Sequence, residues 1–135
     1  PAAAVVVAPI RALKMHGGVA KADLGREDLG ALERGFANLR RHVENVRGFG
    51  LPVVVAVNHF VADTAAEHAL LVRLCRDSLD VEAITCRHWA EGAAGAVDLA
   101  KAVVAAAHKG AAFRPLYPDD LSLAAKIETI ATRIY

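Results

Sequence analysis

The sequence is poor in aromatic residues, with four Phe, two Tyr and one Trp among 135 residues. Small and aliphatic side chains therefore have to build most of its core. No apolar run approaches the length of about 20 residues that spans a bilayer, and no charged segment precedes the apolar start as in a signal peptide. The first residue is Pro1 rather than Met. We therefore expect an internal fragment of a larger protein, with no membrane partner.

An excess of charge is also missing, because 16 Lys and Arg residues face 15 Asp and Glu residues. This balance gives no electrostatic footprint for nucleic acid. The two cysteines, Cys75 and Cys86, show no C-x-x-C or metal spacing. We expect them to be reduced core thiols of a cytoplasmic protein, although a buried disulfide would also fit. No His, Cys, Asp and Glu cluster has metal-ligand spacing, so no metal site is expected.

What the sequence does contain is an alternation of strand and helix patterns. Unbroken apolar runs rich in β-branched residues predict buried strands at residues 4–9, 53–57 and 81–86. Apolar residues at three- and four-residue spacings predict helices at residues 27–47, 64–79, 95–108 and 121–135. Strands separated by helices pair in parallel through right-handed crossovers.

The predicted fold is therefore α/β, a three-layer sandwich with a parallel sheet of at least three strands. Because three strands are few for a sheet flanked by helices, we expect further strands upstream, within a larger P-loop-type nucleotide-binding fold. We treat residues 1–135 as one fragment of a larger protein. Within it, residues 1–112 form a strand–helix core, and residues 113–135 form a connector and a terminal helix that docks on a neighbour.

The carboxyl ends of parallel strands form the sheet edge where open α/β proteins bind ligands. Three predicted loops converge there, Ile10–Lys21, Asn58–Thr64 and Arg87–Gly95. The first loop combines cations with a glycine pair: Arg11, Lys14, His16, Gly17 and Gly18. Glycines permit close backbone approach and cations suit an anionic ligand. A solvated basic loop explains the same residues equally well.

The second and third loops carry the other candidates. Asn58 and Asp63 are possible nucleotide contacts, but Asn58 could simply close the strand and Asp63 or Thr64 could cap the next helix. Phe60 and Trp89 could clamp a flat ring such as a pterin, an aminobenzoyl group or an adenine. Alternatively, both rings could cover helix ends. The histidines on predicted helices are expected to be exposed: His42, His68 and His108.

One segment resembles a known family. VAPIRALKMHGG is similar to the second signature of formate–tetrahydrofolate ligases (10-formyltetrahydrofolate synthetases), V-A-T-[IV]-R-A-L-K-x-[HN]-G-G, with Pro9 in place of Thr. The similarity continues through GFANLRRHVENVRGFGLPVVVAVNHFVADT, HWAEG and FRPLY…LSLAAKIETIATRIY. It covers essentially the whole chain, but only a minor, central part of such an enzyme.

The resemblance implies an ATP-dependent ligase that forms 10-formyltetrahydrofolate from formate and tetrahydrofolate through formyl phosphate. In this family the Phe of N-x-F-x-x-D-T and the Trp of W-A-x-G hold the folate, which implies this role for Phe60 and Trp89. Arg11, Lys14 and His16 match signature positions and are assigned only a place near the anionic substrates. No catalytic residue is assigned within this segment.

The glycine-rich ATP loop of the family lies upstream, and no G-x-x-x-x-G-K-[ST] loop occurs in this chain. We therefore expect ATP and Mg²⁺ to be bound mainly by missing segments, and the isolated fragment to be inactive. The full-length enzyme is expected to be a homo-oligomer. The alternative is a non-catalytic folate- or nucleotide-binding or assembly module of the same fold. An unrelated α/β protein of the nucleotide-switch type is a third interpretation, which the signature disfavours.

Overall fold

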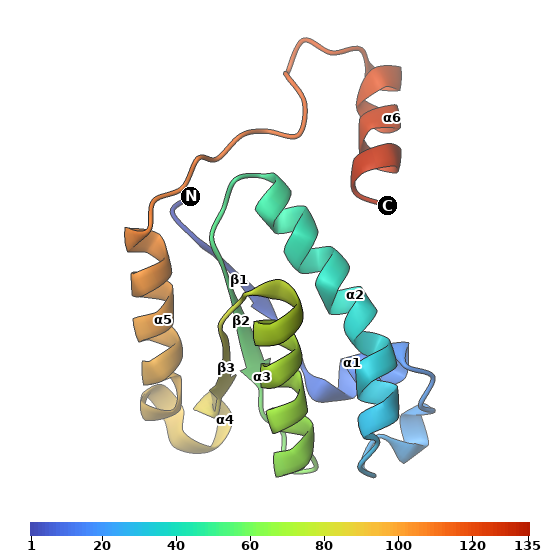
Figure 1. The fold of residues 1–135 in the computed structure, drawn as a ribbon, viewed down its shortest axis with the longest axis vertical. Coiled ribbons are helices and arrows are strands. Elements are labelled where there is room, and N and C mark those ends of the chain that lie inside the picture. The colour runs from blue at the N-terminus through green and yellow to red at the C-terminus, as the bar shows by residue number, and fades with distance from the viewer.

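Three parallel strands form the sheet of this computed structural model, which describes all residues from Pro1 to Tyr135. The strand order is β1-β2-β3 (Figure 1). The strands are β1 (Ala4–Val7), β2 (Val53–Asn58) and β3 (Ala83–Cys86). Ala4 pairs with Val53, and Asn58 pairs with Cys86 at the carboxyl end. The predicted α/β fold with a parallel sheet is confirmed.

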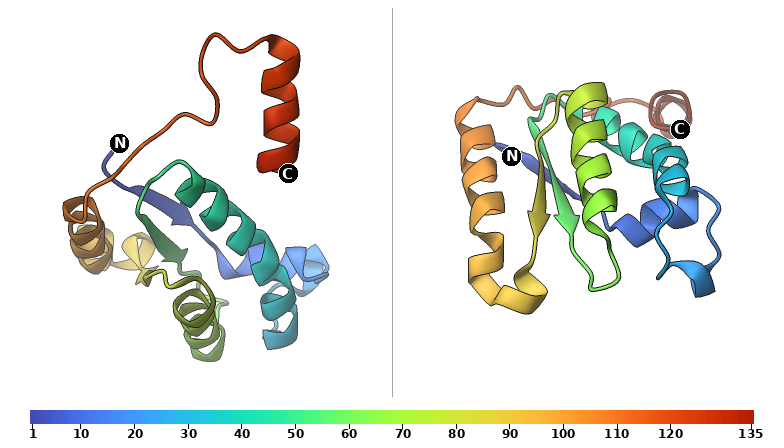
Figure 2. Two further views of the ribbon diagram at one scale, coloured as in Figure 1. Left: turned by 45° about the horizontal axis from the view of Figure 1, so that its top comes forward. Right: turned by 60° about the horizontal axis from the view of Figure 1, so that its bottom comes forward.

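Helices cover the two faces of the sheet unequally. The helices are α1 (Ile10–His16), α2 (Leu29–Gly48), α3 (Ala65–Leu79), α4 (His88–Glu91), α5 (Val97–His108) and α6 (Leu123–Arg133). The first three lie on one side of the sheet and α5 lies on the other (Figure 2). Short 3₁₀ turns at Lys21–Asp23 and Gly92–Ala96 complete the chain. None of the helices combines the length and apolar character that a membrane crossing requires.

The centre of the core is β2, which is buried on both faces as its unbroken valine run predicts. Val53, Val55 and Val57 point into the larger apolar cluster with α2 and α3. Val54 points the other way, against Ala102 and Ala106 of α5. Each face of the strand thus has its own layer of helices. This arrangement fixes the carboxyl end of β2, where the candidate site begins.

The first strand differs from its prediction. Although β1 is also a valine run, Val5 is 41% and Val7 is 60% exposed. The helix α5 contacts β2 and β3, and it leaves this face of β1 open. The strand ends at Val7, and Pro9 becomes the residue that precedes α1. A valine run therefore predicted the strand correctly and its complete burial wrongly.

Two of the three predicted loops contain helices. The segment Ile10–Lys21 is mostly α1, because Pro9 presets the backbone before a run of good helix formers. Ile10 and Leu13 then bury the inner face of this helix. The segment Arg87–Gly95 holds α4 and part of the second 3₁₀ turn. The chain's third strand begins at Ala83, two residues later than residues 81–86 predict.

The last helix stands away from the sheet (Figure 1). Its apolar residues Leu123 and Ile127 are 75% and 59% exposed. It is tied to α2 by the side chain of Asn45, which donates to the carbonyl of Ile134 at 3.1 Å. A hollow of about 800 Å³ lies between α2, the connector and α6. It is far from the carboxyl edge of the sheet, and its lining is mostly apolar.

Both cysteines are free and buried. Burial raises the pKa of the Cys75 thiol to about 12, which keeps it protonated and unreactive. The structure thus agrees with two reduced core thiols and not with a disulfide.

Candidate functional site

Phe60 and Trp89 line one cavity at the carboxyl edge of the sheet. The cavity has a volume of about 490 Å³, and its other lining residues are His59, Val61, Arg87 and Ala90. Pockets for small ligands usually fall between about 300 and 1,000 Å³. The indole of Trp89 is 80% exposed, so its face is free for a ligand. The two aromatic side chains therefore meet at a common gap, one after β2 and one after β3.

The loop that carries Phe60 is held in place by Asp63. The main-chain N–H of Phe60 donates to Oδ2 of Asp63 at 2.8 Å, and the N–H of Asp63 donates back to the carbonyl of Phe60 at 2.9 Å. The cap of α3 is Thr64, whose hydroxyl accepts from the N–H of Glu67 at 3.2 Å. Of the two cap candidates, the structure thus selects Thr64. Asp63 instead fixes the turn that presents the aromatic ring.

Arg11 supports the same ring from α1. Its guanidinium carbon lies 5.2 Å from the centroid of the Phe60 ring, which is within the range of a cation–π contact. Arg11 is exposed and does not belong to the cavity wall. The α1 segment and the Phe60 loop are therefore linked at the ligand-binding edge.

Two buried polar atoms lie near the loop that carries Phe60, one at the end of β2 and one on α3. Asn58 Oδ1 and His68 Nε2 are both buried without a hydrogen-bond partner. The other ring nitrogen of His68 is 3.3 Å from the hydroxyl of Thr85, and its Nε2 is 3.8 Å from the carboxylate of Asp63. The His68 ring stacks on His59 with 4.9 Å between centroids. Buried polar atoms without a partner are uncommon in folded proteins, and neither residue lines the cavity.

The structure corrects the expectation that His68 is exposed, because 12% of its side chain is accessible. Burial lowers the pKa of His68, and the nearby His59 and Arg87 lower it further, while Asp63 and Glu67 act in the opposite direction. The signal for its burial is its place in α3: His68 lies three residues before Leu71, which is fully buried. Helical spacing could therefore have revealed that this histidine faces inward.

We predict that His68 lowers the stability of the folded protein in mild acid. Its folded pKa is lower than its unfolded pKa, so the unfolded chain binds more protons and stability falls as pH drops below about 6.5. Urea unfolding at pH 7.5 and 5.5 should show a smaller loss for His68→Gln than for the unchanged protein. The exposed His108→Gln is the control and should retain the full loss. Equal losses in all three proteins would contradict the prediction.

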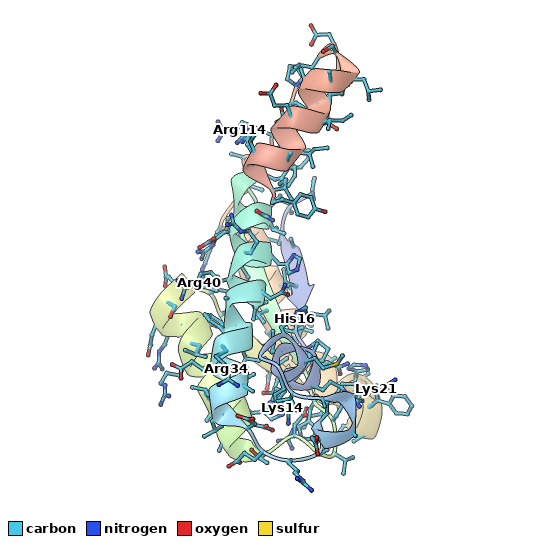
Figure 3. All side chains as sticks on the ribbon, turned by 90° about the vertical axis from the view of Figure 1, so that its right-hand side faces the viewer. Lys14, His16, Lys21, Arg34, Arg40 and Arg114 are labelled. Carbon is cyan, nitrogen blue, oxygen red and sulfur yellow. The ribbon has the colours of Figure 1, made fainter.

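Lys14 is the largest correction among the predicted cations. Its side chain is completely buried, and its ammonium donates to the carboxylate of Glu67 at 2.8 Å. The other two donors go to the carbonyls of Leu24 and Arg26, at 2.8 and 2.9 Å. Figure 3 labels Lys14 where α1 packs beside α2. An ammonium has three N–H donors, and all of them are used. Lys14 is therefore a structural residue that joins α1, the following loop and α3, and has no donor left for a substrate.

The glycine pair also divides into two roles. Gly17 is buried where α1 meets α2, and a Cβ at this position would lie 1.9 Å from the carbonyl oxygen of Ala31. The guanidinium of Arg34 donates to the carbonyl of Gly17 at 3.0 and 3.1 Å. Gly18 has a φ of +98° and open space around it. Gly17 thus serves helix packing, while Gly18 and the exposed His16 remain accessible.

Comparison with known proteins identifies the family of this chain. The family model described as formate–tetrahydrofolate ligase matches residues 1–135. A formate–tetrahydrofolate ligase of Methylobacterium sp. (strain 4-46) is 67% identical over 100% of this chain and 25% of its own length. The corresponding ligase of Paracoccus denitrificans (strain Pd 1222) is 64% identical over 100% of this chain and 24% of its own length.

The chain belongs to the formate–tetrahydrofolate ligase family. It spans about a quarter of the length of the curated relatives that it matches.

Within the ligase family signature, Pro9 stands where Thr is usual. The carbonyl of Pro9 accepts from the N–H groups of Ala12 and Leu13 at 3.0 and 3.3 Å, so α1 starts normally. No side chain caps this helix. Proline suits the start of a helix because its φ is already fixed. Pro9 is therefore compatible with a normal start of α1, and it lacks the hydroxyl that Thr would place there.

The residues of this ligase segment form no group of three or more His, Cys, Asp or Glu side chains that could hold a metal ion. They also do not fit a Mg²⁺–ATP site of the phosphate-loop type, which needs a glycine-rich loop ending in Lys and Ser or Thr.

Proposed function

We propose that the complete protein is an ATP-dependent ligase that forms 10-formyltetrahydrofolate from formate and tetrahydrofolate through formyl phosphate. This chain supplies the folate side of the pocket. The observation that carries the proposal is the cavity of about 490 Å³ shared by Phe60 and Trp89. Membership of the ligase family supports the substrate class. No residue of this chain is assigned a covalent or proton-transfer role.

The cavity suits the pterin or aminobenzoyl ring of a folate. Phe60 reaches it from the loop after β2, and Trp89 reaches it from α4 after β3. A flat conjugated ring between them can stack on one or both, and each such contact contributes about 1 kcal/mol beyond the apolar area that it buries. The carboxamide oxygen of Asn58 is an unused acceptor at the end of β2. It is buried and Asn58 does not line the cavity, so a hydrogen bond from a ring N–H group needs a shift of the loop that follows β2.

Arg11, His16 and Gly18 are proposed as the contacts nearest to the anionic substrates. They are exposed, and they lie on α1 or directly after it at the same sheet edge. Asp63 serves the site indirectly, because its carboxylate already holds the Phe60 turn. Lys14 and Gly17 are excluded from this group by their packing.

ATP and Mg²⁺ are proposed to be bound mainly by other parts of the complete ligase. This chain by itself is then inactive, and residues 113–135 act as the connector and helix that dock on those parts. The exposed Leu123 and Ile127 of α6 support this docking role. A cytoplasmic location and a homo-oligomeric ligase remain proposals from the family resemblance.

Replacing either cavity aromatic should weaken folate binding selectively. In the complete protein, Phe60→Ala and Trp89→Ala should each raise the KM for tetrahydrofolate about tenfold, because each removes about 1.4 kcal/mol of stacking and burial. The KM for ATP should stay within about twofold. Steady-state kinetics with each substrate varied in turn measures both values.

Phe113→Ala is the matched control for these variants. Phe113 is also a partly exposed aromatic residue, but it stacks on Phe49 far from the cavity. It should leave the KM for tetrahydrofolate unchanged. Equal increases in the KM values for tetrahydrofolate and ATP after Phe60→Ala or Trp89→Ala would reject the assignment of the cavity to folate.

A further inference from the structure

Arg87 is the one permanently charged side chain on the wall of the aromatic cavity. It lies beside Phe60, Trp89 and three other residues: His59, Val61 and Ala90. The remaining surface is mostly apolar, so this guanidinium dominates the charge that a bound molecule would meet. Arg87 lies outside the signature segment VAPIRALKMHGG.

The backbone of Arg87 is firmly held, whereas its guanidinium makes no hydrogen bond and has only a loose ionic contact with Glu91. Its N–H donates to the carbonyl of Gly95 at 3.0 Å, and its own carbonyl accepts from the N–H groups of Ala90 and Glu91, both at 3.0 Å. The side chain is 57% exposed. The carboxylate of Glu91 is 3.9 Å away, which is too far for a hydrogen bond. The main chain therefore fixes the position of Arg87, and the N–H donors of its guanidinium are available to a ligand.

A folate carries negative charges that a guanidinium can bind. The assignment of Arg87 to these charges rests on the proposed function. Beyond its two rings, tetrahydrofolate ends in a glutamyl group with two carboxylates. The rings fit between aromatic side chains, but a carboxylate against an apolar wall needs a cationic hydrogen-bond donor. A guanidinium meets a carboxylate with two parallel N–H donors, the strongest form of this contact.

We propose that Arg87 binds a carboxylate of the glutamyl tail and makes the site selective for glutamylated folates over pteroates. Arg11 is the other arginine at this edge, but its guanidinium lies over the Phe60 ring and does not line the cavity. Its position makes it a support for that ring. Glu91 is the nearby opposing charge, and its loose pairing with Arg87 must yield when the tail binds.

The test compares two ligands in the complete protein: tetrahydrofolate, and tetrahydropteroate, which lacks the glutamyl group. Dissociation constants are measured by calorimetry for the unchanged protein, Arg87→Ala, Arg87→Lys and Glu91→Gln. Arg87→Ala should weaken tetrahydrofolate about tenfold and leave tetrahydropteroate within twofold. Arg87→Lys should recover part of the loss, since it keeps the charge but not the two-donor geometry. Glu91→Gln should tighten tetrahydrofolate about twofold.

Arg73→Ala removes an exposed arginine from α3 and is the matched control, which should leave both ligands unchanged. Equal weakening of both ligands by Arg87→Ala, or no weakening of either, would overturn the proposal. Phe60→Ala and Trp89→Ala separate this outcome from a failure of the folate site itself. If they weaken both ligands, the rings bind in the cavity whatever Arg87 does, and if they weaken neither, the proposed function fails as well.

Discussion

Replacing Lys14 with Met is expected to destabilise the protein by about 3–5 kcal/mol, the usual effect of removing one partner from a buried ion pair. Both Lys14 and Glu67 have fully buried side chains. The substitution leaves the Glu67 carboxylate without its cation and removes a donor from the carbonyls of Leu24 and Arg26. Chemical denaturation of the complete protein measures the change. Lys21→Met, at an exposed position, should stay within about 0.5 kcal/mol.

The Glu67 carboxylate connects the Lys14–Glu67 ion pair to other parts of the fold. Burial acts to raise the pKa of Glu67, but hydrogen bonds from Lys14 and from the N–H groups of Thr64 and Asp28 outweigh it and lower that pKa. Because the pKa of Glu67 is lower in the folded protein than in the unfolded chain, its carboxylate stabilises the fold at pH values above the unfolded pKa. This stabilisation is lost as the pH falls through the folded pKa. The single carboxylate therefore links α1, the start of α2 and the capping box of α3.

A double variant separates the ion pair from the rest of this network. Lys14→Met combined with Glu67→Gln removes both charges, and it should be more stable than Lys14→Met alone because no uncompensated buried charge remains. It should not reach the stability of the unchanged protein, since the two carbonyls stay without their donor. A double variant less stable than either single variant would contradict the buried-charge explanation.

Gly35→Ala is expected to be as damaging, at about 3 kcal/mol or more. A Cβ on Gly35 would lie 1.8 Å from the carbonyl oxygen of Leu13 and 3.0 Å from the amide nitrogen of Gly17. These are main-chain atoms, so no side-chain rotation can relieve the overlap, and α1 must move away from α2. Hydrogen exchange should show faster exchange of amide protons in both helices, together with a lower midpoint of chemical denaturation.

Gly48→Ala provides the comparison within the same helix. A Cβ on Gly48 would have nothing within 4 Å, and its φ is not positive. Because alanine favours the helix over glycine, this variant should be neutral or more stable by up to about 1 kcal/mol. Equal effects of the two substitutions would show that helix propensity, and not the contact between α1 and α2, explains the result for Gly35.

The displacement of α1 has a consequence at the site. Arg11 on α1 lies over the Phe60 ring, so a shifted α1 withdraws that support. The folded part of a Gly35→Ala preparation should therefore also bind tetrahydrofolate more weakly. This links the tight packing of two helices to the shape of the aromatic cavity.

The parallel sheet was predictable because a strand that is buried on both faces has an unbroken run of apolar residues. The valine run of β2 has no polar residue until Asn58, and this run is buried at every position before it. The three- and four-residue spacing that predicted a helix at residues 27–47 matches its buried face, which includes Leu32, Phe36 and Val43. The same valine pattern misled at β1, because a run of valines cannot show whether a helix covers both faces of a strand.

The site was predictable in outline for a topological reason. Parallel strands bring their carboxyl ends to one edge, so residues that follow β2 and β3 must be near each other. This reasoning placed Phe60 and Trp89 at a common gap, where the structure has them. It left out His68, which follows no strand and whose burial is indicated only by its helical spacing from the buried Leu71.

The sequence by itself determined the presence of the strands, their parallel connection, the edge where their carboxyl ends meet and the family signature, because each depends on local pattern or on topology. Only the tertiary structure decided which charged residues are accessible. Lys14 is neutralised by Glu67, which lies 53 residues away, whereas Arg87 has no close partner on the cavity wall. A charge is buried or free according to what packs against it from distant segments, and no pattern of neighbouring residues records that contact.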